Sequence, residues 1–378
     1  MKKKVLFILI SGLIFTSYQL KDENIVRFNE FSISKEIHAE VPIIIDFKDT
    51  LSNDTLVEYL SEEQIPVMYS RKFLTGVCID GKCRMLNIEL FWNITGRYLG
   101  FKLPEGEFLS KTEHVKFNSN EYDMLNHLLA NPLSELANYS LKELVPEEDT
   151  TKYKVDAVSS ATIAAVLDYI VPGAVYTTYT LWHYVYGPTK QEIEKITSER
   201  LSTEIALELL NSQNKDDQIW TLNHISGKVE ISVSLQDKLM EIISGNDIYL
   251  AEQSLHTLKP ENLTSEIQIE LINTFIKVGF LQKRLIIQKL EDSPNLDNYV
   301  IKKFSSELNG LNGVLVKTIL EMFTIHNVED EMVTENVSEL LKDDNRYIAK
   351  QAFKYLENID NPDKKTVRDI EKYKKNNL

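Results

Sequence analysis

A short run of hydroxyl-bearing and small side chains, Asp156-Ala157-Val158-Ser159-Ser160-Ala161-Thr162, comes directly before the apolar run at 163–167. Ser159 is a favourable N-cap residue, so a helix is predicted to begin here with Thr162 in its first turn. The amide groups of a first turn have no partner within the helix, and the helix dipole is positive at that end. A phosphate held at Thr162 would benefit from both. The same residues also suit the cap of an ordinary helix.

The run resembles the D-x-x-[S/T]-G-A-T motif of the FMN-binding domain family, which includes the flavin-carrying subunits of Rnf and Nqr electron-transport complexes. In that family the last threonine is esterified to the phosphate of FMN, and the resemblance implies this role for Thr162. It implies that Asp156 holds the preceding turn or orients the hydroxyl for a flavin transferase. Ala161 leaves room for the prosthetic group, and Ser160 stands where glycine is usual.

The segment that follows the motif, 169–186, is dense in aromatic residues. Tyr176, Tyr179 and Trp182 recur at three-residue steps and therefore fall on one face of a predicted helix. Such a face could stack on a flavin ring and reduce its contact with water. An aromatic stripe at helical spacing is more often part of a protein core, so both roles stay open.

The two cysteines, Cys78 and Cys83, flank Asp80-Gly81, which is a strong signal for a two-residue hairpin turn. In that register Cys78 faces Cys83 as a non-hydrogen-bonded pair within disulfide range. Closing so small a loop contributes little stability, so the disulfide is either a structural pin or a redox-active pair. The C-x4-C spacing differs from that of thioredoxin-type sites, which disfavours a thiol–disulfide oxidoreductase.

Residues 1–20 are predicted to be a secretory signal peptide, because Lys2, Lys3 and Lys4 precede an apolar core too short to span a bilayer comfortably. An uncleaved signal anchor is the alternative. The protein is therefore expected to be exported to the periplasm or another extracytoplasmic location, without a transmembrane span in the mature chain. The formal net charge of −15 argues against a nucleic-acid partner, since no basic face is evident to meet phosphates.

Residues 21–188 are predicted to form an α+β domain like the FMN-binding domain. Helical spacing of apolar residues marks 51–63 as a helix. Asn118 and Glu121 form a capping-box pattern at the start of another helix, which Asn131-Pro132 ends. The expected strands are 41–47, 67–73 and 85–92.

Residues 189–362 contain few glycines and show helical periodicities of roughly a dozen residues, separated by short polar turns. Asp216 and Asn246 begin similar polar-then-apolar segments 30 residues apart, close to the length of a helical pair. An all-α domain of HEAT-like repeats is therefore predicted. The charged tail, 363–378, is expected to fray.

Two functions follow from these patterns. The first is an extracytoplasmic electron-transfer flavoprotein that carries FMN through a phosphodiester to Thr162, with a flavin transferase and a membrane or periplasmic redox protein as partners. The second is a non-catalytic interaction protein that works through its helical repeats, with a degenerate flavin-type domain. The histidines share no metal-ligand spacing, so no metal site is predicted.

Overall fold

The computed structural model describes residues 25–33, 35–49, 51, 53–76, 85–111, 114–144, 166–360 and 362–377. These residues form two compact units. The first contains Ile37–Leu60 and Met68–Glu192 together with the chain before Phe31. The second contains Ile193–Leu378 and two short segments from earlier in the chain, Phe31–Glu36 and Ser61–Val67.

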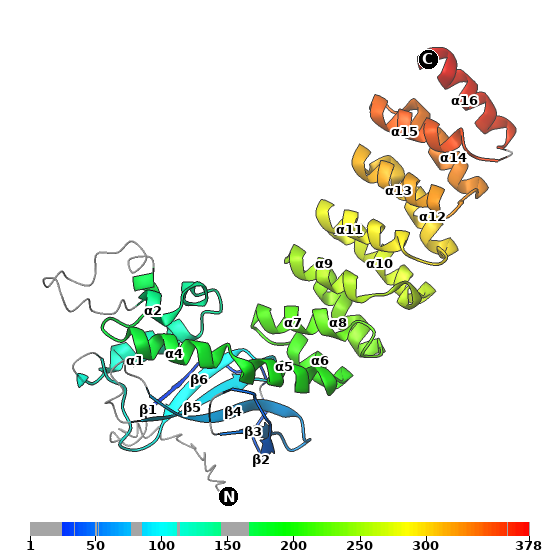
Figure 1. Cartoon of the computed structure of the whole chain (residues 1–378). Helices are drawn as coiled ribbons and strands as arrows, with labels where there is room; N and C mark the ends of the chain where they lie inside the picture. The colour runs from blue at the N-terminus through cyan, green and yellow to red at the C-terminus, as the bar shows by residue number, and fades with distance from the viewer. Residues whose placement is uncertain are drawn as a thin grey trace, which may run out of the picture. The chain divides into compact units, whose positions relative to one another are not determined.

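The first unit is built on a six-stranded antiparallel sheet with the strand order β1-β6-β5-β4-β3-β2 (Figure 1). This agrees with an N-terminal β-containing domain, and the expected strands at 41–47, 67–73 and 85–92 correspond to β2, β4 and β5. The strands are β1 (Ile25–Phe28), β2 (Ala39–Ile44), β3 (Thr55–Leu60), β4 (Pro66–Thr75), β5 (Leu86–Asn93) and β6 (Tyr98–Leu103).

The helix expected at 51–63 is wrong, because this segment contains strand β3. Leu56 and Leu60 have a spacing that suits a helix, yet both are buried in the sheet. Tyr59 belongs to the opposite face of the strand from Leu56 and Leu60. It is also buried, and it packs with Met68 and Phe91 in a separate apolar cluster. A strand buried on both faces loses the two-residue alternation that marks a strand, so its sequence pattern is ambiguous.

The ladder between β4 and β5 runs from Met68 opposite Asn93 to Thr75 opposite Leu86. This register agrees with the one expected from a two-residue turn at Asp80-Gly81. The cysteines predicted to face each other in that hairpin, Cys78 and Cys83, lie outside the described residues.

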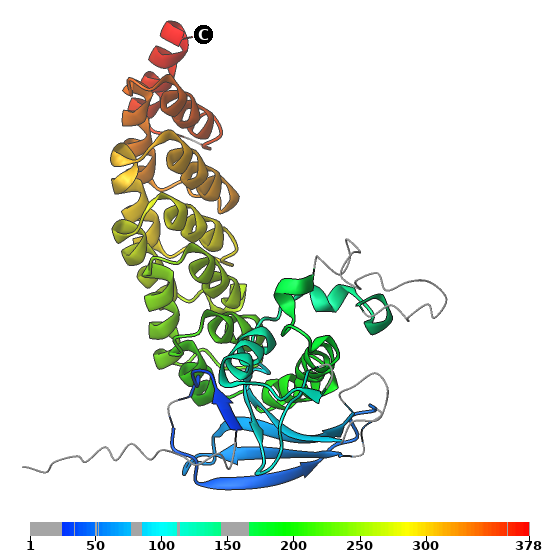
Figure 2. The ribbon, with the colours of Figure 1, turned by 90° about the vertical axis from the view of Figure 1, so that its left-hand side faces the viewer.

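Helices α1 (Ser119–Leu129) and α4 (Val175–Val185) lie on one face of this sheet (Figure 2). The predicted capping box of α1 is confirmed, with Asn118 and Glu121 each accepting a backbone N–H. Tyr98 on β6 donates its hydroxyl to Asn126 on α1 at 3.0 Å. Trp92 on β5 donates its Nε1–H to the carbonyl of Val185 on α4 at 2.9 Å. Aromatic side chains with a polar end therefore fix both helices to the sheet. Shorter elements in this unit are η2 (Glu135–Asn138), α2 (Leu141–Leu144) and η3 (Leu167–Tyr169).

The second unit is a stack of helical pairs arranged in two rows (Figure 1). The first row contains α6 (Thr203–Leu210), α8 (Val233–Ser244), α10 (Ser265–Lys277), α12 (Asn298–Glu307), α14 (Glu331–Glu339) and α16 (Lys364–Asn377). The second row contains α7 (Lys215–Ile225), α9 (Ile248–Thr257), α11 (Phe280–Glu291), α13 (Gly313–Ile325) and α15 (Arg346–Leu356). Helix α5 (Pro188–Glu199) precedes them, and the division between the units falls within it.

The stack confirms a largely α-helical second part and refines its period. Successive helices of the second row begin 32 or 33 residues apart, rather than the 30 expected from the sequence. Polar N-cap side chains set most of these starts by accepting backbone N–H groups of the first turn. They include Asn214, Asp247, Asn312 and Asn345 in the second row. One continuous apolar core runs through the unit from α6 to α15.

The expectation that the charged end frays is wrong for residues 364–377, which form α16. Tyr373 stacks on Phe353 of α15 with ring centroids 5.1 Å apart. Lys374 pairs with Glu357 at 2.9 Å. The charged sequence therefore contains enough apolar and ionic contacts to hold its helix on the stack.

Asn312→Ala tests the role of the N-caps. The Asn312 side chain accepts the N–H groups of Val314 and Leu315 at 3.0 and 3.1 Å, and its loss should destabilise α13 by about 1 kcal/mol. Amide hydrogen exchange in α13 should become about fivefold faster. Asn309→Ala, at an exposed position before the cap, is the control and should leave exchange unchanged. Equal exchange in both variants would show that the cap contributes nothing to this helix.

Candidate functional site

The residues of the flavin motif, Asp156, Ser159, Ser160, Ala161 and Thr162, lie outside the described residues. The aromatic residues predicted to accompany them, Tyr176, Tyr179 and Trp182, all lie on α4. The structure therefore describes only the aromatic part of the predicted site, which lies on α4.

Trp182 belongs to the core of the first unit. It is 5% exposed, and its Nε1–H donates to the carbonyl oxygen of Asn131 at 3.0 Å. Its ring packs against Tyr186 with centroids 4.7 Å apart. Since the ring is enclosed and its polar atom is hydrogen-bonded, Trp182 fixes α4 in the fold.

Tyr176 and Tyr179 are half-buried and keep part of their surface exposed. Tyr179 lies against His183 with ring centroids 4.0 Å apart, and the carbonyl of Tyr179 is 2.9 Å from His183 Nδ1. Elsewhere on α4, Tyr184 stacks on Phe73 of the sheet at 4.9 Å. The aromatic residues of α4 therefore divide between the core and a partly exposed side that includes Tyr176 and Tyr179.

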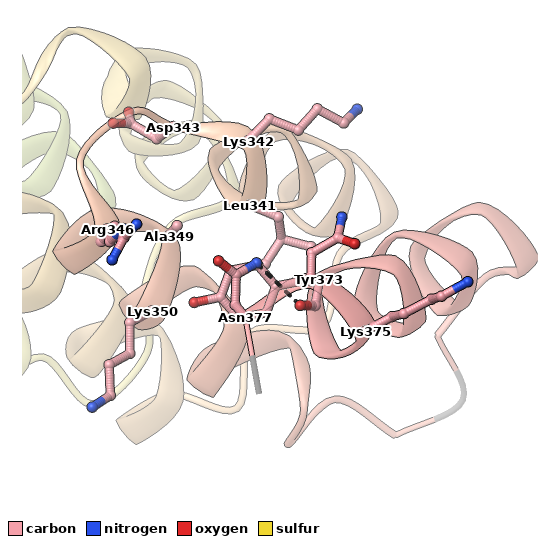
Figure 3. A pocket seen from close by; sticks show the side chains of 10 residues that line it. Leu341, Lys342, Asp343, Arg346, Ala349, Lys350, Tyr373, Lys375 and Asn377 are labelled. Atoms are coloured by element: carbon pink, nitrogen blue, oxygen red, sulfur yellow. Dashed lines mark hydrogen bonds between the residues drawn. The ribbon is translucent and has the colours of Figure 1, made fainter.

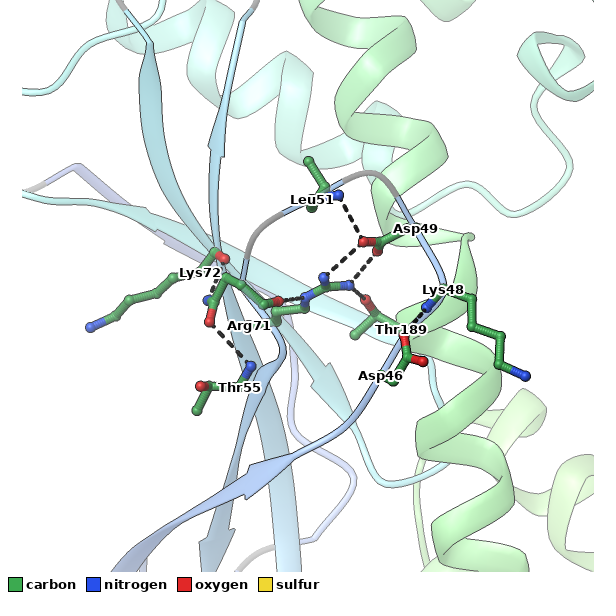
Figure 4. A network of polar contacts seen from close by, with 9 residues as sticks. Asp46, Lys48, Asp49, Leu51, Thr55, Arg71, Lys72 and Thr189 are labelled. Atoms are coloured by element: carbon green, nitrogen blue, oxygen red, sulfur yellow. Dashed lines mark hydrogen bonds and ion pairs between the residues drawn. The ribbon is translucent and has the colours of Figure 1, made fainter.

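A buried arginine, Arg71 on β4, is the centre of a polar network in the same unit (Figure 4). Its Nη1 and Nη2 donate to the two carboxylate oxygens of Asp49 at 2.7 and 3.2 Å. Its Nε donates to the carbonyl of Asn53 at 2.9 Å, and Nη1 donates to Oγ1 of Thr189 at 2.8 Å. The guanidinium carbon lies 3.7 Å from the ring centroid of Phe47. This combines a bidentate ion pair with a cation–π contact.

All three nitrogens of this guanidinium are engaged, so the network has a structural role. It joins the β2–β3 connection, at Asp49 and Asn53, to the middle of β4. It also holds the first turn of α5 through Thr189. Neither the composition nor the spacing of the sequence marks Arg71, because its partners come from two segments that lie far apart in the sequence, the β2–β3 connection and α5.

Other buried polar groups of the sheet are also paired. Tyr69 donates its hydroxyl to Glu58 at 2.7 Å, and Ser70 donates to Glu89 at 2.7 Å. Burial raises the pKa of Tyr98 well above its ordinary value. Within the described ranges, no cluster of three or more His, Cys, Asp or Glu side chains could hold a metal ion. The same part of the chain contains no helix long and apolar enough to cross a membrane.

The second unit carries a regular row of exposed apolar side chains, which we call the apolar column: Tyr249, Leu281, Val314 and Tyr347. Each lies two residues after the N-cap of its helix, in α9, α11, α13 and α15 respectively. Each leaves between 44% and 53% of its surface exposed. Because the helices repeat every 32 or 33 residues, these positions fall in one line along the second row.

Two contacts show how the column is built. The ammonium of Lys215, the first residue of α7, lies 5.5 Å from the ring centroid of Tyr249 on α9. Gly313, the first residue of α13, lies so close to Tyr347 that an added Cβ would be 2.8 Å from the ring. In both cases the aromatic ring lies against the first residue of the preceding helix in the second row. A hydrogen bond from Lys215 also lowers the pKa of Asp247, the N-cap of α9.

Single exposed apolar residues are normal on protein surfaces, but aligned ones are typical of interaction sites. The apolar column is therefore the candidate functional site of the second unit. The sequence did not reveal it, because each member is followed directly by another residue that belongs to the core, such as Leu250, Leu315 and Ile348.

No family model, curated protein or solved structure matches the chain. The structure defines a protein with an N-terminal antiparallel sheet unit and a largely helical second unit.

Arg71→Ala should destabilise the first unit by about 3 kcal/mol, because it leaves the largely buried Asp49 without its partner. Urea unfolding followed by tryptophan fluorescence measures this. In a Trp220→Phe background the remaining tryptophans, Trp92 and Trp182, both report on the first unit.

Arg27→Ala is the matched control, since Arg27 forms a partly exposed ion pair with Asp123 in the same unit. Its loss should cost about 0.2–1 kcal/mol. Arg71→Lys should fall between the two, because it keeps the charge and loses the bidentate geometry. Equal effects of Arg71→Ala and Arg27→Ala would contradict the structural role of the network.

Proposed function

We propose that this protein is an interaction protein whose helical repeats, HEAT-like in character, bind a segment of a partner protein along the apolar column. The observation that carries this proposal is the alignment of four exposed apolar side chains at equivalent positions of successive helices. Stacked helical pairs offer an extended surface on which each repeat contributes one contact. Exposed aromatic residues add contact area with few rotatable bonds, which favours binding.

A test begins with peptides selected from a displayed random library against the purified protein. Their affinities are measured by fluorescence polarisation. Tyr249→Ala and Tyr347→Ala together should weaken a selected peptide by roughly 30-fold, because two aromatic contacts of about 1 kcal/mol each are removed.

The control is Tyr299→Ala on α12 in the first row. Tyr299 also lies two residues after its N-cap and is 50% exposed, so it differs from the column mainly in location. Its replacement should leave peptide affinity unchanged. Failure to select any binder, or equal losses in the first-row and second-row variants, would reject the apolar column as the binding surface.

The sequence motif supports a second proposal, which is compatible with the first. We propose that the first unit is an extracytoplasmic electron carrier with FMN joined through a phosphodiester to Thr162. Two partly exposed tyrosines, Tyr176 and Tyr179, lie on α4, the helix that follows the motif, and support a flavin-contacting face there. The third predicted contact, Trp182, is enclosed in the core and is left out of this face.

Bound FMN would supply electron-transfer chemistry, and the chain would hold and shield it. Ser159 would cap the helix that begins at the motif, and the first-turn N–H groups would donate hydrogen bonds to the phosphodiester oxygens. Tyr176 and Tyr179 would cover part of the ring. Attachment would require a flavin transferase in the extracytoplasmic compartment to which residues 1–20 are predicted to direct the chain.

Co-expression with a flavin transferase in an exporting host, followed by intact-mass measurement and in-gel fluorescence, tests this second proposal. The mass should rise by that of FMN less water, and Thr162→Ala should abolish both the added mass and the fluorescence. Ser160→Gly should retain both, because it restores the residue usual in the family motif. Unmodified protein under these conditions would leave the interaction function as the account of the chain.

A further inference from the structure

Three basic residues follow the apolar column from helix to helix, and we call them the basic row: Arg284, Lys317 and Lys350. Each lies five residues after the N-cap of its helix, in α11, α13 and α15 respectively. Each therefore comes three residues after a member of the column. Residues three apart on a helix are neighbours on its surface, so the basic row runs beside the apolar column.

The same position in other helices of the stack shows that this run of charge is a local feature. On α9 the residue five after the N-cap is Glu252. In the described helices of the first row, from α8 to α16, the position carries mixed side chains: Asp237, Ile269, Lys302, Glu335 and Arg368. Among these helices, three successive basic residues occur only beside the column.

The basic row is available to an anionic group. Arg284 and Lys350 are exposed, and neither forms an ion pair within the described part of the chain. Lys317 pairs with Glu321 at 3.2 Å, and their side chains are 43% and 55% exposed. An ion pair this exposed contributes little, so a carboxylate of a ligand can replace Glu321. The chain as a whole has a net charge of −15, and the basic row therefore marks a place where acidic groups are attracted to an acidic protein.

The spacing of the helices indicates the conformation of the ligand. Successive helices of the second row pack directly on one another, α9 on α11, α11 on α13 and α13 on α15 (Figure 1). Packed helices have axes about 8–10 Å apart. A chain in the polyproline II conformation returns to the same face every third residue, over about 9.3 Å. A β-strand returns every second residue, over about 6.7 Å. A polyproline II segment therefore matches the spacing of the column, with one residue for each helix.

We infer that the apolar column and the basic row together bind an extended acidic segment of a partner protein. Every third residue of the segment is apolar and lies on the column, and carboxylates beside these residues meet the basic row. The inference rests on the interaction function proposed above and adds the chemistry of the partner.

The charges also give the segment a direction. Glu252 stands at the α9 end of the series, whereas the basic row covers α11, α13 and α15. The acidic part of the segment therefore lies toward α15. A polynucleotide carries a phosphate at every residue and would bring one against Glu252, so a protein segment is the better match.

The library selection described above gives a first test. Peptides selected on the full protein should contain apolar residues three apart, with aspartate or glutamate beside them. Their affinity should fall at least about tenfold when Arg284→Glu and Lys350→Glu are combined, because attraction becomes repulsion at two of the three positions.

A designed probe gives a second test. It is a fluorescein-labelled peptide of about 12 residues made of leucine-proline-glutamate repeats, in which proline favours the polyproline II conformation. Its companion has glutamine in place of glutamate. The glutamate probe should bind at least about tenfold more tightly, and raising NaCl from about 50 mM to about 300 mM should reduce this difference. Glu252→Lys should strengthen binding of the glutamate probe about twofold, since it extends the basic row by one helix.

The matched control is Lys302→Glu combined with Arg368→Glu. Both residues are exposed and lie five residues after the N-caps of first-row helices, Asp297 and Asp363. This variant has the same net charge as Arg284→Glu with Lys350→Glu, yet it should change affinity for the glutamate probe less than about twofold. Circular dichroism spectra of all variants should match that of the native protein.

The outcomes separate this inference from the proposed function. Selected peptides that require Tyr249 and Tyr347 but bind the Arg284→Glu, Lys350→Glu variant equally well would overturn the inference and leave the apolar column as a binding surface. Equal binding of the glutamate and glutamine probes, or no binding of either, would also overturn it. A single-stranded oligonucleotide that binds more tightly than the glutamate probe, and loses affinity in the same variant, would make a nucleic acid the occupant. Failure to select any peptide would reject the proposed function and this inference together.

Discussion

The fixed register of one helical pair on the next is the constraint on which the second unit depends. Buried amide side chains set it by satisfying carbonyl groups at helix ends. Gln282 on α11 donates to the carbonyls of Ile243 and Gly245 at the end of α8, at 3.1 and 2.6 Å. Gln268 on α10 donates to the carbonyls of Leu263, just before α10, and of Asn295, in the connection between α11 and α12, at 2.8 and 2.9 Å.

These bonds are directional, so they fix the position of α11 on the end of α8 and of the α11–α12 connection on α10. The exposed residues then repeat at the same place in every pair, and the apolar column follows from that repetition. The buried glutamines therefore link the stability of the stack to the regularity of its surface.

Local signals in the sequence predicted the parts of the fold that local forces decide. The capping box at Asn118 and Glu121 specified the start of α1, and the Asp80-Gly81 signal agreed with the register of β4 and β5. Strand β3 was missed because its burial on both faces depends on neighbours far away in sequence. The repeat length came out short because Asp216 was compared with Asn246, whereas the equivalent N-caps are Asn214 and Asp247.

The candidate sites were likewise predicted only where neighbouring residues in the sequence decide their placement. The aromatic side chains of α4 were found from their spacing, but only the structure separates the enclosed Trp182 from the partly exposed Tyr176 and Tyr179. Arg71 was not predicted, because Asp49, Asn53 and Thr189 approach it only in the folded chain. The open pocket between α15 and α16 (Figure 3) is lined by residues of η6 (Leu340–Lys342), α15 and α16, so no single segment of sequence displays it.

The position of α16 affects how easily this helix detaches from the stack. Within the described chain this helix packs on α14, α15 and η6, whereas α13 has second-row neighbours on both sides, α11 and α15. Within the described chain, detaching α16 breaks contacts on one side only, and detaching α13 breaks contacts with second-row neighbours on both sides. We therefore expect α16 to detach at a lower free energy than α13. A ligand that bound across α15 and α16 would raise the free energy of this detachment, by an amount that grows with the logarithm of its concentration above Kd. The frequency with which α16 detaches from the stack would then indicate whether such a ligand is bound.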